Sequence, residues 1–421
     1  MANEYNPYDP AVLQDPYPCY ERMRARSPMF RSSFGSGYWG YTLPGEEEKP
    51  IYVAIGYDEL SAVLEDSERF TSAFKTGPDP SPVIHEEIAA AGGHPVMPTL
   101  YSMDPPEHTR RRRLLQRAMS AERVAAREHE IRAVAGELVE GFAAGGHAEL
   151  IDRFCTPFVK ASLFEHIGVP RQDHEKIAQG NEAFKEVCIP GSSDLELRHA
   201  CRELVDYQRY FEGAIAERQR EPRNDLLGLL AEARKDPDCP ISTAEMGWGL
   251  MDMIGAGYGN TIEALANLLY LLLSEPDRWA ELVADRALVA SAVEEGLRFD
   301  GPVHWLSRNT TEEVELGGET LPKDVTVVCA FAAANRDPEA FPEPEKFDLR
   351  RGGAGKHGRH LATGRGVHYC FGALWARAAL RVGVEVLLDR LPGLRLSDGF
   401  EVSYLASAPM FRVVSEMPVR W

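Results

Sequence analysis

The sequence lacks the features of a secreted, disulfide-stapled or membrane-spanning chain. Its 7 cysteines are odd in number and scattered, with no CxxC pair, which argues against a disulfide framework and a structural zinc site. Met1–Pro10 has no basic segment followed by an apolar one. The longest nearly apolar run, Ala264–Leu273, is too short to cross a bilayer. We therefore expect a cytoplasmic protein without a membrane anchor.

Positive charge is also scarce. Lys and Arg number 46 against 65 Asp and Glu in 421 residues, a formal net charge of −19. A chain this acidic is poorly suited to binding nucleic acid or an anionic membrane. Hydrophobic residues at 44% and charged residues at 26% are ordinary for a folded protein, which excludes disorder and collagen-like repeats.

Helical periodicity dominates the chain, and no repeat or convincing linker divides it, so we expect a single domain over residues 1–421. β-like patterns occur near 30–60 and 303–330 and in the C-terminal tail, and Gly77–Pro98 is rich in Pro and Gly, which predicts a long loop. The fold class is therefore mainly α with a smaller β-rich part. The predicted helices are His108–Met119, Glu122–Phe142, Leu195–Arg218, Thr243–Leu273, Ala287–Phe299 and Ala373–Leu391.

The segment 363–372, TGRGVHYCFG, contains the strongest chemical signal. Its three glycines allow a tight turn and a close approach of backbone, and Cys370 stands just before a predicted helix. The positive end of that helix would stabilise a thiolate. A thiolate without zinc partners is a candidate axial ligand for haem iron, although an isolated cysteine is more often a small buried hydrophobe.

This segment resembles the cysteine-ligand loop of cytochromes P450, whose pattern is Phe, Gly, x, Gly, x, His or Arg, x, Cys, x, Gly. The matching residues are Gly364, Gly366, His368, Cys370 and Gly372, whereas Thr363 stands where the family has Phe. The resemblance implies that Cys370 binds the iron of haem b. It also implies the cytochrome P450 fold, with the haem between a long distal helix and the cysteine loop. Because packing around a haem ligand tunes its potential, Thr363 predicts an altered reduction potential.

Other family landmarks follow in order. Glu295 and Arg298 match the ExxR motif, and their i, i+3 spacing puts them on one helix face. Arg351 best matches the third member of this structural network, in which a buried charge persists only if it is paired. By resemblance, the remaining haem contacts are the propionate partners and an alanine of the long helix: His108, Arg112, Arg308, His368 and Ala256.

The long helix departs from the family pattern at the oxygen site. The family has Ala-Gly-x-acid-Thr-Thr, whereas Gly259 replaces the acid here and Asn260 replaces the first threonine. Asn260 can form hydrogen bonds but is no practical acid, and Thr261 lies about 100° further round the helix. Three explanations remain open: water or a polar substrate group replaces the proton relay; the enzyme uses peroxide directly; or its oxidant is the earlier peroxo species or a radical that never rebounds.

Position along the long helix also suggests a polar substrate contact. Asp252 lies two turns before Asn260 on roughly the same face, and it either binds a basic or hydroxylated substrate group or pairs with a neighbouring side chain. His304 is a second polar candidate. By resemblance, the other residues expected to line the pocket are Val96, Met97, Phe184, Gly255, Val303, and Ala408 or Met410.

The combined prediction is a haem-thiolate monooxygenase of the soluble bacterial type, acting on a small molecule of secondary or catabolic metabolism. Because the sequence has no flavin or dinucleotide fingerprint, electrons would come from a ferredoxin and its reductase, or from peroxide. The basic residues expected on the docking face are Arg110, Arg113, Arg117, Lys356, Arg359 and Arg365. The alternatives are a peroxide-driven or radical-coupling P450 and a haem-binding sensor without turnover.

Overall fold

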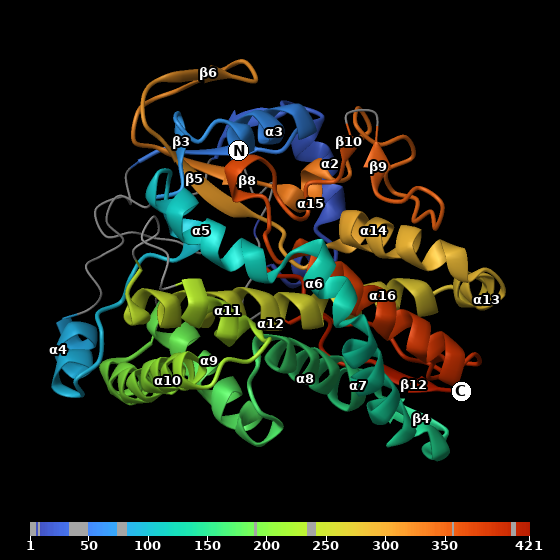
Figure 1. Cartoon of the computed structure of the whole chain (residues 1–421). Helices are drawn as coiled ribbons and strands as arrows, with labels where there is room; N and C mark the ends of the chain where they lie inside the picture. Colours follow the sequence, from blue (N-terminus) through green and yellow to red (C-terminus); the bar gives the residue numbers. More distant parts are fainter. Residues whose placement is uncertain are drawn as a thin grey trace. The chain divides into compact units, whose positions relative to one another are not determined.

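The computed structural model describes residues 6, 9–32, 49–73, 82–188, 192–233, 241–355, 358–405 and 410–421. Helices predominate and the strands are short (Figure 1), so the predicted fold class, mainly α with a smaller β-rich part, is confirmed. Two compact units share the chain, and the single domain expected over 1–421 stays a prediction. The first unit comprises Met1–Ala73, Glu128–Phe158 and Asn260–Trp421, and the second Phe74–Arg127 and Val159–Gly259.

A five-stranded sheet forms the β-rich part of the first unit, in the order β1-β2-β8-β5-β3. β2 (Ile51–Ala54) and β8 (Thr326–Cys329) are parallel, with Ile51 opposite Thr326, and the other pairs are antiparallel. All four side chains of β2 are buried, as expected for a central strand covered on both faces. The other strands of this sheet are β1 (Met29–Arg31), β3 (Phe70–Thr71) and β5 (Leu306–Thr310).

Smaller sheets and helices complete the first unit. β6 (Val314–Leu316) pairs with β7 (Glu319–Leu321), β9 (Ala354–Gly355) with β10 (Gly358–Arg359), and β12 (Pro418–Arg420) lies between β11 (Arg395–Leu396) and β4 (His147–Glu149). Its helices are α1 (Pro10–Gln14), α2 (Tyr17–Arg24), α3 (Tyr57–Glu65), α7 (Glu128–Glu140), α13 (Pro276–Ala284), α14 (Val289–Asp300), α15 (Phe331–Ala334) and α16 (Ala373–Arg390), with short turns η3 (Ala143–Gly145), η4 (Ile151–Cys155), η6 (Arg286–Leu288) and η7 (Gly366–His368).

The second unit is helical throughout the part that the structure describes. α10 (Asp194–Arg220) packs along α9 (His174–Cys188) and α4 (Pro82–Ala90) (Figure 1). The start of α10 is specified locally, because Ser193 and Glu196 form a reciprocal capping box. The other elements are η2 (Leu100–Ser102), α5 (Glu107–Ala118), α6 (Ala121–Ala126), most of α8 (Thr156–Ile167), η5 (Arg171–Asp173) and α11 (Leu226–Ala233).

The longest helix, α12 (Thr243–Leu273), has 31 residues and no proline, and its predicted bounds are confirmed. The boundary between the two units falls inside it, between Gly259 and Asn260. Most of its residues are buried, but Gly255–Asn260 are exposed or partly exposed. The middle of the helix is thus less buried than the stretches on either side of it.

Two sequence predictions about local structure are wrong. The loop expected over 77–98 contains α4, because Ile84 and Ile88 bury one helix face; residues 74–81 lie outside the described part. The single helix expected over 122–142 ends at Ala126 and restarts at Glu128. There the Arg127 guanidinium donates to the carbonyl oxygens of residues 165 and 166, at the end of α8, a distant contact that helical periodicity does not reveal.

Candidate functional site

The loop before α16 holds Cys370 by backbone hydrogen bonds. The Cys370 N–H donates to the Thr363 carbonyl at 2.9 Å, and the Ala373 N–H donates to the Cys370 carbonyl at 3.3 Å. Gly372 is the N-cap of α16, and a Cβ added to it would lie 3.9 Å from the Cys370 sulfur. Cys370 itself is exposed. The sulfur is therefore accessible next to the positive end of a helix.

Glycine is needed in this loop for two different reasons. Gly364 and Gly366 have φ of +70° and +66°, a region that other residues rarely adopt. A Cβ on Gly366 would also lie 2.3 Å from the Leu64 carbonyl oxygen. After this turn, a ring nitrogen (Nε2) of His368 lies 2.9 Å from the Ser72 hydroxyl.

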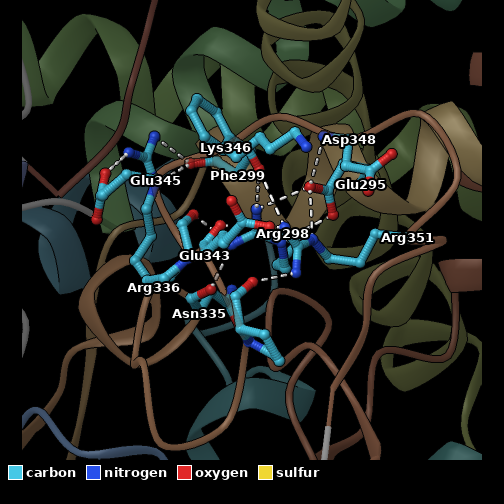
Figure 2. Close-up of polar contacts among 12 residues, drawn as sticks. Glu295, Arg298, Phe299, Asn335, Arg336, Glu343, Glu345, Lys346, Asp348 and Arg351 are labelled. Atoms are coloured by element: carbon cyan, nitrogen blue, oxygen red, sulfur yellow. Dashed lines mark hydrogen bonds and ion pairs between the residues drawn. The ribbon is translucent and has the colours of Figure 1, made fainter.

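A buried charge network fixes the segments that precede this loop (Figure 2). Arg298 donates from Nε and Nη2 to the two Glu295 carboxylate oxygens, both at 2.8 Å, and the two side chains are 0% exposed. Arg351 adds a second cation to Glu295 at 3.0 Å. The remaining donors of Arg298 bind backbone carbonyl oxygens of Asn335, Pro344 and Lys346. The network thus connects α14 with two later segments of the first unit.

The less buried middle of α12 contains the proposed oxygen site. Ala256 is exposed and Asn260 partly exposed, whereas the neighbouring Thr261 is 4% exposed. Thr261 therefore faces the protein interior. Residues 255 and 259 are glycines, so no side chain projects from α12 at these two positions.

Phe184 of α9 packs against this part of α12 within the second unit. A Cβ on Gly255 would lie 3.1 Å from the Phe184 ring and 3.6 Å from Oδ1 of Asn181. That amide oxygen is buried and has no hydrogen-bond partner in the described structure. Asn181 is not among the residues predicted from the sequence, although its i, i+3 spacing from Phe184 is a usable signal.

Asp252 lines a small crevice in the second unit, together with Leu100 and Arg111. Its Oδ2 accepts a 2.8 Å hydrogen bond from the Leu100 N–H. Burial raises the pKa of the Asp252 carboxyl to about 6, although this hydrogen bond and the Arg111 charge act in the opposite direction. Trp248 lines the same crevice, and its indole N–H is buried without a partner in the described structure; the sequence carried no signal for it.

Substituting Asp252 by asparagine should raise stability in a pH-dependent way. The folded-state pKa, about 6 against the usual 3.8, means that the wild-type protein loses stability as pH rises through this window. Asparagine at position 252 cannot carry the negative charge of the aspartate, and its side-chain oxygen can still accept the hydrogen bond from the Leu100 N–H. We expect a gain of about 1–3 kcal/mol in the free energy of unfolding above about pH 6.5 and little gain near pH 4, measured by chemical unfolding monitored by tryptophan fluorescence.

Asp66→Asn is the matched control for this experiment. Burial tends to raise the pKa of Asp66, but hydrogen bonds and charge from Arg69 lower it overall. Replacing this carboxylate by an amide should therefore lower the free energy of unfolding at neutral pH. An Asp252→Asn protein that is no more stable than wild type at neutral pH would contradict the prediction.

His304, the second polar candidate, lies in a buried cluster of the first unit. Its ring Nδ1 is 3.3 Å from the Tyr20 hydroxyl, and Nε2 is 3.9 Å from Asp300. Arg412 and the Tyr17 hydroxyl also contact Asp300. His304 thus has a hydrogen-bond partner at Nδ1, whereas Nε2 is buried without a hydrogen-bond partner in the described structure.

The other predicted residues are distributed between the two units. In the second unit, His108 is 1% exposed, Arg112 and Val96 are partly exposed, and Met97 lines a crevice with Trp248 and Met251. In the first unit, Arg308 is 5% exposed, Val303 forms a bridge with Phe411, and Met410 is partly exposed. Ala408 and Lys356 lie outside the described residues.

Several of the expected docking arginines already have carboxylate partners. Arg110 contacts Glu107 and Glu245, both at 2.7 Å, and Arg365 lies 2.6 Å from Glu65. Arg113 and Arg117 are exposed.

Within the described ranges, no helix is long and apolar enough to span a membrane.

Within the first unit, the exposed Cys370 beside Gly372 fits the thiolate ligand of a haem iron. Within the second unit, Ala256 is a small, exposed residue of α12. Two candidate propionate partners, His108 and Arg308, are buried polar side chains, of the type that buried carboxylates require.

Comparison with known proteins identifies the family. The cytochrome P450 family model matches residues 188–392. The chain is 33% identical to cytochrome P450 monooxygenase PikC of Streptomyces venezuelae, over 97% of this chain and 91% of that protein. It is also 33% identical to nocardicin C N-oxygenase of Nocardia uniformis subsp. tsuyamanensis, over 99% and 98%.

Solved structures agree with these relatives. The Tepidiphilus thermophilus P450 heme domain matches with a TM-score of 0.84 at 26% identity, over 100% of this chain and 97% of that one. CalO2 matches with a TM-score of 0.82 at 26% identity, over 99% and 98%. The resemblance found in the motifs is thereby confirmed over nearly the whole length, and this chain belongs to the cytochrome P450 family of haem b oxidoreductases.

Proposed function

We propose that this P450 is a monooxygenase that oxidises a small organic molecule with O2 and electrons from a ferredoxin system, and that its proton path does not use an acid–threonine pair. The observation that carries the proposal is the less buried middle of α12, where Gly259 and Asn260, both partly exposed, stand at the two relay positions. Haem b, when bound, supplies the activation of dioxygen. The chain supplies binding and orientation.

Cys370 is the proposed iron ligand, and its exposed sulfur next to Gly372 supports this role. His108, Arg112, Arg308 and His368 are the proposed propionate partners. Two buried carboxylates need cationic or hydrogen-bonding partners, and the burial of His108 and Arg308 supports their assignment.

The proton path must avoid both relay positions. Gly259 has no side chain, and the Asn260 amide donates and accepts hydrogen bonds but releases no proton near neutral pH. The Thr261 hydroxyl is buried. We therefore assign proton delivery to water or to a polar substrate group near the middle of α12.

The substrate is proposed to be a small organic molecule with a polar group near Asp252. Relatives named nocardicin C N-oxygenase and 6-deoxyerythronolide B hydroxylase, the latter 31% identical over 88% of this chain and from Saccharopolyspora erythraea, support such a substrate. Val96, Met97, Phe184 and Gly255 are the proposed contacts in the second unit. In the first unit, Val303 and Met410 remain proposed contacts, whereas His304 already has protein partners.

A separate ferredoxin in the cytoplasm is the proposed electron donor. The chain has no flavin or dinucleotide fingerprint. The exposed Arg113 and Arg117 can attract an acidic partner, while Arg110 and Arg365 are already paired with carboxylates of this chain.

Turnover with two electron sources tests the proposal. We expect product with a ferredoxin, its reductase and NADPH, and little product with hydrogen peroxide. Asn260→Ala should lose less than about tenfold in turnover, whereas removal of a group that transfers a proton costs 10²–10⁴-fold. Thr261→Ala, at the buried neighbouring position, is the matched control.

Each alternative gives a different result. Product with peroxide alone would favour a peroxide-driven enzyme, and product that contains no added oxygen atom would favour radical coupling. No product from either source, with haem bound and a broad substrate panel, would favour a haem-binding sensor. A loss above about 10²-fold in Asn260→Ala would contradict the proposed proton path.

A further inference from the structure

Two adjacent glutamates on α14 bind different partners. Glu295 belongs to the network with Arg298 and Arg351. The Glu294 carboxylate instead accepts from Nε and Nη2 of Arg377 on α16, the latter at 3.1 Å, and lies 3.2 Å from Nε2 of His360. All three side chains of this second network, Glu294, His360 and Arg377, are at most 20% exposed.

The protonation of the second network follows from its hydrogen bonds. Nδ1 of His360 accepts a hydrogen bond from the Ala362 backbone N–H at 3.2 Å. The ring proton therefore sits on Nε2, and this N–H donates a hydrogen bond to the Glu294 carboxylate. Burial lowers the pKa of His360, which favours the neutral ring. Burial tends to raise the pKa of Glu294, but the bonds from His360 and Arg377 bring it down to about 2. The carboxylate is therefore the single negative charge opposite Arg377 in this network.

Arg377 extends the network to the residue before the cysteine. Its Nη1 donates to the Tyr369 hydroxyl at 3.3 Å and to the Ala373 carbonyl at 3.4 Å. His360 precedes Cys370 in the chain, and Arg377 follows it on α16. One carboxylate thus connects α14 to both ends of the cysteine loop.

Packing fixes the histidine side of the network. The backbone N–H of His360 donates to the Gly353 carbonyl oxygen at 3.0 Å. A Cβ on Gly353, whose φ is +65°, would lie 2.5 Å from Cδ2 of His360 and 2.9 Å from the Glu294 carbonyl oxygen. The Leu361 N–H donates to Oδ1 of Asn335 at 2.6 Å. The segment after His360 therefore has little freedom to move.

We propose that Glu294 is a positioning residue for the cysteine ligand: it holds Arg377 against Tyr369, and so orients the Tyr369–Cys370 segment for stable binding of the haem iron by the thiolate. This role is separate from that of Glu295, whose partners are Arg298 and Arg351. The inference rests on the proposed role of Cys370. Removing a residue that orients a metal ligand typically costs 10–100-fold in metal affinity or activity.

The experiment compares haem-bound Glu294→Gln and Glu294→Ala with wild type. We expect the reduced, carbon monoxide-treated variants to lose the red-displaced Soret band of thiolate ligation roughly tenfold faster than wild type. Their reduction potential should also differ from that of wild type. Arg377→Lys keeps the positive charge but loses the two hydrogen bonds from Nε and Nη2 to Glu294, so its band lifetime and potential should match those of the Glu294 variants. Glu294→Asp should restore part of the wild-type band lifetime and potential.

Glu128→Gln is the matched control. It removes a half-buried ion pair to Arg381, one turn further along the same helix α16, and should leave the band and the potential unchanged. Glu294 variants that unfold at a lower temperature yet keep the wild-type band lifetime and potential would overturn the proposal. A wild-type protein that never gives the red-displaced band would instead refute the assignment of Cys370.

Discussion

Replacing Glu295 by glutamine is expected to lower the free energy of unfolding by about 3–5 kcal/mol. Glu295 and Arg298 are both 0% exposed, and Arg351 adds a second cation to the same carboxylate. Without the negative charge, two guanidinium groups remain beside a neutral amide. Urea unfolding of the haem-bound protein, monitored by tryptophan fluorescence, measures the loss.

Glu275→Gln provides a control with the same spacing. Glu275 and Arg278 are also i, i+3 partners at 2.7 Å, but the Glu275 side chain is 66% exposed. Exposed ion pairs contribute about 0–1 kcal/mol, so this variant should be close to wild type. Equal losses in the two variants would contradict our view that burial makes the Glu295 network structurally important.

Replacing Cys370 by serine should abolish the red-displaced Soret band of the reduced carbon monoxide complex and all monooxygenase turnover. A serine hydroxyl is not ionised near neutral pH and cannot replace a thiolate ligand. The loop should keep its shape, because its hydrogen bonds to Thr363 and Ala373 use only the backbone of Cys370. The carbon monoxide difference spectrum, recorded at equal haem content, measures the change.

Cys188→Ser is the matched control, because Cys188 is also exposed and lies at the end of α9. It should leave the spectrum and turnover unchanged. A Cys370→Ser protein that retains the red-displaced band would show that another residue binds the iron, and the proposed function would have to be abandoned.

Local spacing explains the successful predictions from sequence. The 31 residues of α12 contain no proline, so the whole helix could be predicted from periodicity. The i, i+3 separation of Glu295 and Arg298 is a property of one helix, and their contact follows once α14 forms. The glycines around Cys370 likewise require a turn that the backbone then adopts.

Contacts between distant segments explain what could not be predicted. Glu294 and Glu295 are adjacent and chemically identical, yet one binds His360 and Arg377 and the other Arg298 and Arg351. The packing of α14 against α16 brings Arg377 to Glu294, and the folding of the segments around residues 351 and 360 brings Arg351 to Glu295 and His360 to Glu294. The helix expected over 122–142 is likewise interrupted at Arg127, whose guanidinium binds the end of α8.

The sequence by itself determined the helical class, the cysteine loop and the departure at Gly259 and Asn260, since each depends on residues that are close along the chain. Tertiary structure alone decided that Asp252 accepts from Leu100 and that His304 is enclosed by Tyr20 and Asp300. The physical reason is that a buried polar group takes whichever partner the fold brings within hydrogen-bond distance, and sequence spacing does not encode that choice.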